Sequence, residues 1–298
     1  MTGILFAMQG AISQGILWSI MSLGIYITFR LLAISDLSVD GTFAVGGCVM
    51  ATLITLGITP LLATTIAIIG GAIGGLVTGL LHTKCHIPAI LAGILTQLGV
   101  YSINLRLMGR SNLPLLKLNT IFKQIEAMVG LSQTNSSLIV GIIVVAIVIA
   151  IMYWFFGTEI GSAIRATGSN ENMVRSLGVN TDSTKIIGFM IANALVALSG
   201  ALVAQSQGYA DVKQGIGAIV IGLASIIIGE TMIRKQTNFA IRLCMIVLGS
   251  IIYRLIIDIV LQLGLNTYYL KLFSAILVAL FLTAPQLIKT KKGGVHHA

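Results

Sequence analysis

Two short acidic breaks interrupt the long apolar stretches of this sequence: Asp36-Leu-Ser-Val-Asp-Gly41 and Asp211-Val-Lys-Gln-Gly215. A carboxylate within an apolar span costs about 2.5–3.5 kcal/mol on insertion scales, so such groups usually mark a pathway or an ion pair. Backbone groups freed at a helix break can also line a wet cavity. We therefore expect the breaks to border a route for a small polar solute, with loop capping as the alternative. The residues expected on this route are Asp36, Ser38, Asp40, Gly41 and Asp211.

Arg254 and Asp258 are two further ionisable residues within an apolar stretch. Their spacing of four residues places them on one face of a helix, where opposite charges can pair. We expect a structural ion pair, and a role in a solute pathway is the alternative.

The residue patterns needed for catalysis or nucleotide binding are missing from the sequence. The chain has no Gly-Lys dipeptide, so it lacks the glycine-rich loop that cradles phosphates. His82 and His86 have the spacing of two metal ligands on one helix face, but no carboxylate is nearby, so we expect a solvated turn. All four histidines lie in polar segments, which leaves no Ser-His-Asp set. We expect no enzyme activity, no catalytic residue, no metal site and no cofactor bound by this chain.

The composition predicts that these residues are held by membrane-spanning helices. Of the 298 residues, 56% are hydrophobic and only 9% are charged, whereas a soluble domain carries about 25% charged residues. The 18 Lys and Arg residues outnumber the nine acidic ones, but they form no dense basic stripe with interleaved aromatic residues, so nucleic acid is not an expected partner. The lipid bilayer is the expected surroundings. Cys48, Cys85 and Cys244 are too far apart to indicate a disulfide framework.

Nine stretches are long and apolar enough to be spans, since a helix needs about 20 such residues to cross the bilayer. The second and seventh are short and rich in glycine, as are the broken helices of transporters. We expect an all-α polytopic membrane protein with one transmembrane domain over 1–298. The expected spans are 8–30, 42–58, 60–81, 88–106, 137–156, 185–206, 214–230, 238–263 and 268–287.

The distribution of basic residues predicts which side of the membrane each loop faces. With the N-terminus outside and the C-terminus in the cytoplasm, 11 of the 18 Lys and Arg residues fall on the inner side, as the positive-inside rule favours. Four of the seven exceptions gather in or beside the outer loop 107–136. Because clustered charge speeds capture of an oppositely charged partner, we expect a docking surface there, with merely solvated charges as the alternative. Its residues are Arg106, Arg110, Lys117 and Lys123.

The two acidic breaks also indicate an internal repeat. Each follows a long span and precedes a glycine-rich apolar helix, and on the expected topology the two preceding spans run in opposite directions. Two inverted halves with interrupted helices are common in transporters, which place the substrate path between the halves. The alternative is that two glycine-rich helices are alike only in composition.

The longest polar insert on the inner side, 157–184, is expected to form an amphipathic helix over 161–179. Its basic residues Arg165 and Arg175 are offset by the acidic Glu159 and Glu171, so it has no net basic face to hold anionic lipid, and we expect it to dock into a groove of a partner. A helix lying on the lipid headgroups is the alternative. Glycines are expected to let the segment bend, and apolar residues to fill the partner's groove. The residues assigned to this coupling are Gly161, Arg165, Gly168, Asn170, Glu171, Met173, Leu177 and Gly178.

Five segments of the sequence resemble a known family. The stretch from Gly161 to Asn180 resembles the cytoplasmic coupling segment of ATP-binding-cassette importer permeases of the branched-chain amino acid and ribose class. Asp36-Leu-Ser-Val-Asp-Gly-Thr-Phe43 is similar to a segment of the sugar members. Leu91-Ala-Gly-Ile-Leu-Thr96, Tyr101–Gly109 and Gly217–Glu230 resemble the subgroup often labelled tryptophan/tyrosine permeases. The resemblance covers nearly the whole chain and is more specific for the permease role than for the substrate.

This resemblance implies a membrane subunit like those of type II importers, which have about ten helices. We expect nine here, because the extra N-terminal span of the sugar members has no counterpart. It also implies a dimer with a second permease copy, a cytoplasmic ATPase dimer that binds ATP and Mg, and an extracytoplasmic substrate-binding lipoprotein. The expected location is the cell membrane.

The implied function is import of a small solute, most readily an amino acid with an aromatic side chain. Import of a sugar or nucleoside by the same mechanism is one alternative. An ion-coupled secondary carrier is another, and it would have no use for the segment 161–179. A membrane scaffold is a third, and it would need neither helix breaks nor buried carboxylates.

Overall fold

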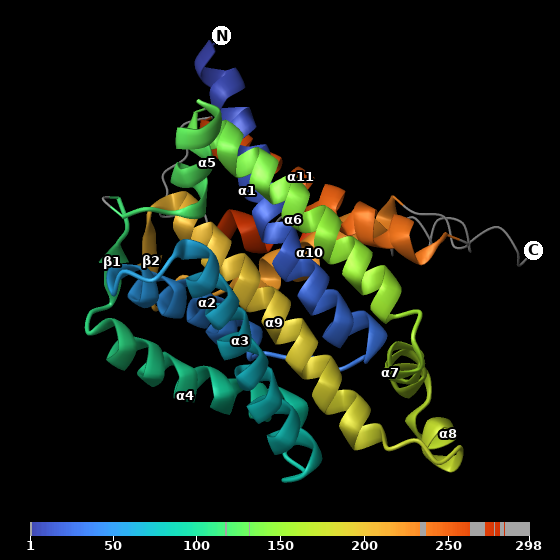
Figure 1. Cartoon of the computed structure of the whole chain (residues 1–298). Helices are drawn as coiled ribbons and strands as arrows, with labels where there is room; N and C mark the ends of the chain where they lie inside the picture. The colour runs from blue at the N-terminus through green and yellow to red at the C-terminus, as the bar shows by residue number, and fades with distance from the viewer. Residues whose placement is uncertain are drawn as a thin grey trace, which may run out of the picture.

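The computed structural model describes residues 2–116, 118–130, 132–232, 237–262, 272–276, 278–280 and 283. These residues form a bundle of helices with one pair of very short strands (Figure 1). In chain order the elements are α1 (Thr2–Tyr26), the π-helix η1 (Ile27–Leu31), α2 (Val39–Thr55), α3 (Pro60–Thr83), α4 (Ala89–Met108), β1 (Asn112–Pro114), α5 (Ile121–Val129), α6 (Gln133–Phe155), α7 (Glu159–Ser169), α8 (Glu171–Ser176), α9 (Thr181–Gln207), β2 (Tyr209–Asp211), α10 (Ala218–Thr231) and α11 (Phe239–Gln262).

The expected all-α membrane architecture is confirmed by eight apolar helices. Six are long enough to cross a bilayer, and α2 and α10 are the two shorter ones, as the sequence predicts. These eight correspond to the first eight expected stretches. The ninth, 268–287, lies mostly outside the described residues, so the predicted count of nine is not confirmed. Large apolar side chains on α3, α4 and α6 face outward, as a lipid environment requires.

Local sequence signals set the ends of several helices. Pro60 is the first residue of α3, where its missing N–H costs no helix hydrogen bond. Gly109 and Gly208 follow α4 and α9 with φ of 66° and 77°, a left-handed conformation that glycine adopts without strain. At the start of α9 the Asn180 side chain accepts hydrogen bonds from the backbone N–H groups of Asp182 and Ser183, so it caps the helix.

Helix α9 occupies the centre of the bundle, and glycines let its neighbours approach closely. A Cβ added at Gly46 of α2 would lie 1.9 Å from the carbonyl oxygen of Ala197, and one at Gly200 of α9 would lie 2.0 Å from that of Phe43. A Cβ at Gly71 of α3 would come within 2.5 Å of the Asn193 carbonyl. Small residues at such crossings allow the backbone contact on which helix association in membranes depends.

The helix contacts follow the predicted pattern of two inverted halves. Helices α1 to α3 form one half and α9 to α11 the other: α1 packs against α11 as α9 packs against α3, and α1 touches α10 as α9 touches α2. Helices α1 and α9 contact each other and run in opposite directions (Figure 1). The halves are therefore intertwined around these two helices.

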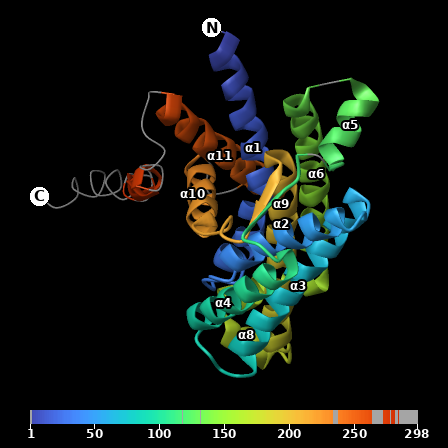
Figure 2. The ribbon, with the colours of Figure 1, turned by 90° about the vertical axis from the view of Figure 1, so that its left-hand side faces the viewer.

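The connecting segments lie at opposite ends of the bundle. Helix α5 lies at one end and α8 at the other (Figures 1 and 2). Strands β1 and β2 pair antiparallel, with Asn112 opposite Asp211. We call the two ends of the bundle the α5 end and the α8 end. Helix α6 runs between them, so the loop 107–136 and the segment 157–184 are separated by the length of a span.

Candidate functional site

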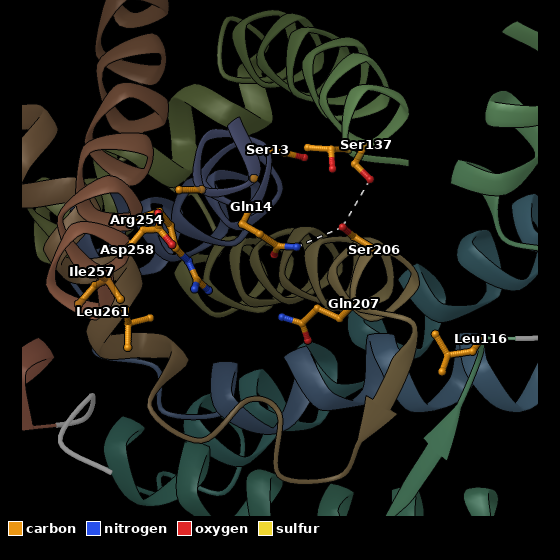
Figure 3. Close-up of a pocket in the computed structure, with 13 residues that line it drawn as sticks. Ser13, Gln14, Leu116, Ser137, Ser206, Gln207, Arg254, Ile257, Asp258 and Leu261 are labelled. Carbon is orange, nitrogen blue, oxygen red and sulfur yellow. Dashed lines mark hydrogen bonds between the residues drawn. The ribbon is translucent and has the colours of Figure 1, made fainter. Parts of the chain in front are cut away.

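A cavity of about 500 Å³ opens between α1, α6, α9 and α11 near the α5 end (Figure 3). Its wall comes from the first half of α1, the start of α6, the end of α9 and the second half of α11, with Leu116 of the loop 107–136 at its edge. Five polar residues matter for its chemistry: Ser13, Gln14, Ser206, Arg254 and Asp258.

Arg254 is the most unusual residue in this wall. Its guanidinium carbon lies 4.2 Å from the centre of the Trp18 ring, a cation–π stack. Its buried Nε has no hydrogen-bond partner within the described part of the chain. Figure 3 shows the guanidinium extending toward the middle of the cavity, on the side where the Gln14 and Gln207 amides lie.

The expected ion pair between Arg254 and Asp258 is wrong. The Asp258 carboxylate instead accepts a hydrogen bond of 2.7 Å from Nε2 of Gln262, one turn further along α11. The Trp18 ring face holds the guanidinium, since stacking on an indole competes with pairing at the next turn of the same helix. Both charged groups are therefore left on the cavity wall.

The α1 side of the cavity carries hydrogen-bonding atoms that are not used by the described protein. Gln14 donates from Nε2 to Ser206 Oγ at 3.1 Å, but its buried Oε1 has no partner in the described chain. The same holds for Ser13 Oγ. Buried polar groups are normally paired, so these atoms are suited to a polar occupant.

Asp36 and Ser38, two of the predicted route residues, belong to a closed network away from this cavity. Asp36 is 2% exposed and accepts hydrogen bonds from Ser38 N at 2.8 Å, Ser38 Oγ at 2.6 Å and Asn193 Nδ2 at 2.8 Å. Thr42 Oγ1 donates to the other amide atom, Asn193 Oδ1, at 2.6 Å. The network joins the start of α2 to the middle of α9.

The other three route residues lie at separate places. Asp40 accepts the backbone N–H groups of Gly217 and Ile219 at 2.9 and 3.0 Å, so it caps the start of α10 and joins the two breaks. Gly41 packs against the backbone of Gln97, where an added Cβ would lie 2.9 Å from Cα. Asp211 lies in β2, where it accepts the backbone N–H of Lys213. The five residues do not form one site, and their place on a route stays a prediction.

The segment 157–184 forms two helices, so the expected single helix over 161–179 is wrong. Asn170 ends α7 and begins α8 with φ −157° and ψ 95°, and its side chain accepts a hydrogen bond from Met173 N. Asparagine favours such caps because its side chain satisfies a backbone N–H that the helix leaves free. The break turns α8 away from α7 at the α8 end (Figure 1).

Two glycines expected to let this segment bend are needed for close packing instead. A Cβ at Gly168 would lie 1.8 Å from the Leu31 carbonyl oxygen, and one at Gly161 would lie 2.2 Å from that of Phe155. Neither has positive φ, whereas Gly178 after α8 does, at 85°, a conformation typical of a glycine that ends a helix. Gly168 thus fixes α7 against the end of η1.

The apolar surface that this segment offers to a partner's groove is small. Val174 is buried, while Met173 and Leu177 are 50% and 72% exposed. Arg165, one of the residues assigned to coupling, lies with its guanidinium carbon 5.5 Å from the Phe239 ring centre. The exposed apolar residues of α8 are therefore Met173 and the following Leu177.

Glu171 fastens α8 to α9. Its carboxylate accepts hydrogen bonds from Lys185 Nζ at 2.7 Å, Arg175 at 3.0 Å and Thr181 Oγ1 at 3.2 Å. The hydrogen bond from Lys185, with the positive charges of Lys185 and Arg175, holds the Glu171 pKa below its ordinary value. The carboxylate is therefore ionised at neutral pH.

The basic residues in and beside the loop 107–136 are not equivalent. Arg106, in the last turn of α4, and Arg110, just after that helix, are both exposed. Lys123 donates from Nζ to the carbonyl oxygens of Leu116 and Leu118, so its charge holds the loop together. Lys117 lies outside the described residues. A docking role for this surface stays a prediction.

The sequence reasoning missed the cavity and the role of Asn193. The sequence contains a signal for both, because Gln14 and Asn193 are polar residues within predicted spans, where each unpaired polar group is costly. The predicted route was based on the acidic breaks, so these two neutral amides were not included.

Comparisons with known proteins agree with this architecture. Residues 7–284 match the family described as branched-chain amino acid transport system / permease component. The chain is 41% identical over 293 residues to the tyrosine transport system permease protein of Clostridioides difficile (strain R20291), covering 98% of this chain and 95% of that protein. It is 27% identical over 172 residues to the ribose import permease protein RbsC of Escherichia coli (strain K12), covering 55% and 51%. The autoinducer 2 import system permease protein LsrC of Escherichia coli (strain K12 / DH10B) is 28% identical over 171 residues, covering 55% and 46%. No solved structure gives a significant match.

Proposed function

Because the chain belongs to the permease family of branched-chain amino acid transport systems, we propose that it is the membrane-spanning subunit of an ATP-driven importer for an amino acid with an aromatic side chain. The observation that carries the substrate class is the 41% identity to a tyrosine transport permease over almost the full length of both proteins. The ribose and autoinducer-2 permeases match only about half of the chain.

In this proposal a separate ATPase dimer in the cytoplasm binds ATP and Mg and docks at the α8 end. Met173 and Leu177 are exposed apolar residues there, and Glu171 holds α8 on α9. Gly168 packs α7 against the end of η1, which leads into the first break. A push on α8 would therefore reach both α9 and the connection between α1 and α2.

The opposite end would receive the solute from an extracytoplasmic binding lipoprotein. Arg106 and Arg110 are exposed charges at this end that would attract an acidic partner surface. The N-terminus lies at this end (Figure 1) and would face outward, with the C-terminus in the cytoplasm. A second permease copy would complete the transporter in the cell membrane.

Uptake into proteoliposomes tests this function. The chain, its ATPase subunits and its binding protein should import radiolabelled tyrosine only when ATP is present on the ATPase side, and leucine or ribose more slowly. Collapsing proton and sodium gradients should leave the initial rate unchanged. Uptake that follows an ion gradient without ATP would support a secondary carrier instead, and ATP-driven uptake of ribose alone would reject the amino acid.

A further inference from the structure

We propose that the cavity around Arg254 binds the zwitterionic end of an amino acid, with Arg254 on the carboxylate and Asp258 on the ammonium group. This inference rests on the proposed import function and adds a binding site in the permease itself. It is carried by one cation and one anion that share a cavity wall without pairing with each other.

The position of Arg254 suits recognition of a carboxylate. A guanidinium is a planar fork whose N–H groups match two carboxylate oxygens, and stacking on an aromatic ring leaves its edge free for such bonds. Trp18 itself is held by Phe43, whose ring centre lies 4.8 Å away. The arginine is thus held against a fixed ring, and its buried Nε has no partner in the described chain.

The charge balance of the wall distinguishes between classes of solute. Arg254 and Asp258 give one charge of each sign, which complements an amino acid. A sugar would leave a buried arginine without a charged partner, which is costly. A simple anion would face the repulsion of Asp258. The unpartnered atoms of Ser13 and Gln14 would add neutral hydrogen bonds.

The size and place of the cavity agree with this assignment. Its volume of about 500 Å³ lies within the 300–1,000 Å³ of ordinary small-molecule sites. Apolar residues, among them Ile257 and Leu261, line the wall beside the charged pair and offer a surface for a side chain. Since the cavity opens near the α5 end, it is suited to accept a solute on the side opposite α8.

The test measures binding of radiolabelled tyrosine to the full chain in lipid nanodiscs, with two competitors. Tyrosinamide lacks the carboxylate charge, and 3-(4-hydroxyphenyl)propionate lacks the ammonium group. The wild-type protein should bind tyrosine better than either. Arg254→Gln should weaken tyrosine binding by about tenfold to a hundredfold, the range for a hydrogen bond to a charged group, and should abolish the preference over tyrosinamide. The tyrosine affinity of Arg254→Lys should lie between that of the wild type and that of Arg254→Gln.

Asp258→Asn is the complementary variant, because its carboxylate bonds only Gln262 in the described chain and lies at the cavity edge. It should lose the preference for tyrosine over the propionate while keeping that over tyrosinamide. Lys213→Gln removes an exposed charge elsewhere and should bind as wild type. Because Lys213→Gln and Arg254→Gln each remove one positive charge, Lys213→Gln is also the net-charge control for Arg254→Gln.

Three results would overturn the site. These are no saturable binding at millimolar tyrosine, unchanged affinity in both charge variants, or an equal loss for tyrosine and both analogues, which would indicate a structural role. Uptake measured with the complete transporter separates these results from a failure of the proposed function. ATP-driven tyrosine uptake with no Arg254-dependent selectivity leaves the importer standing and rejects the site.

Discussion

Asn193 and Arg254 both lie on long apolar helices, but their surroundings differ. The Asn193 amide bonds with Asp36 and Thr42 in a closed buried network. The Arg254 guanidinium instead has a ring beneath it and a cavity beside it. A closed polar network specifies how helices pack, whereas an open one leaves capacity for a ligand. The two residues therefore call for different tests.

Asn193→Leu should destabilise the protein, because it leaves a buried Asp36 oxygen without its donor. An unsatisfied buried group costs about 1–3 kcal/mol, and more when it is charged. The thermal unfolding midpoint in detergent should fall. Asn172→Leu, at an exposed position of α8, is the control and should leave the midpoint unchanged. The double variant Asp36→Leu/Asn193→Leu should recover part of the loss, and an unaltered midpoint in Asn193→Leu would reject this role.

Glu171 should make the attachment of α8 depend on pH. Its folded-state pKa lies below the ordinary 4.5, so its contribution is complete above that value and is lost as pH falls through the lowered pKa. At neutral pH, Glu171→Gln should speed hydrogen exchange of the α8 amides relative to wild type. In acid the two proteins should converge.

The matched control for this pH dependence is Glu159→Gln, which removes an exposed carboxylate at the start of α7. Its exchange in α8 should equal that of wild type at every pH. If Glu171→Gln differs from wild type by the same factor in acid and at neutral pH, the carboxylate does not hold α8 by its charge.

At the scale of helices, glycines determine how closely α2, α3 and α9 pack. Gly46→Ala should push α2 away from α9, since the new Cβ would lie 1.9 Å from the Ala197 carbonyl. Overpacking of this kind costs about 1–3 kcal/mol, so the thermal midpoint should fall. Gly99→Ala on α4 is the control because nothing lies within 4 Å of its added Cβ. Equal midpoints for the two variants would refute the close-packing argument.

Helix α8 should be the contact for the ATPase. Leu177→Asp places a charge on its most exposed apolar side chain, and burial of a leucine is worth about 1.5–3 kcal/mol. The ATPase should no longer co-purify, while the permease stays inserted. Leu56→Asp is the matched control, because Leu56 is also 72% exposed but lies at the α5 end. Retained ATPase with normal uptake in Leu177→Asp would count against the coupling role.

The sequence predicted the helices better than their details. Hydropathy located eight spans, because length and apolar content decide whether a segment enters the bilayer. The sequence did not predict the split at Asn170, because an asparagine that caps a helix cannot be told from one inside a helix before the backbone conformation is known. The spacing of Arg254 and Asp258 wrongly predicted an ion pair. The stack of Arg254 on Trp18 could not be predicted, because the position of Trp18 depends on how α1 packs against α11.

For the whole molecule, the two inverted halves meet at their breaks, where Asp40 of one half caps α10 of the other. The cavity near the α5 end and α8 at the opposite end then give the bundle a direction. Its orientation in the membrane follows from which end faces the cytoplasm.

Cys85 should report that orientation. It is exposed in the turn after α3, at the α8 end, where Lys84 pairs with Asp182 at 3.3 Å. In a Cys244→Ser background, an impermeant maleimide should label Cys85 only after the cells are permeabilised. A cysteine at Leu56, added with Cys85 changed to serine, should be labelled in intact cells. The reverse pattern would place the α8 end outside.

The strand pair at the α5 end carries a consequence for biogenesis. Asn112 and Asp211 are joined by a side-chain hydrogen bond of 3.2 Å across 99 positions, and Leu115 N donates to the Gly208 carbonyl at 2.7 Å. A ribosome must therefore finish α9 before the loop after α4 has its partner strand. Contacts this distant in sequence form late and slowly. During synthesis the loop 107–136 therefore lacks its partner strand until the second half of the protein has entered the membrane.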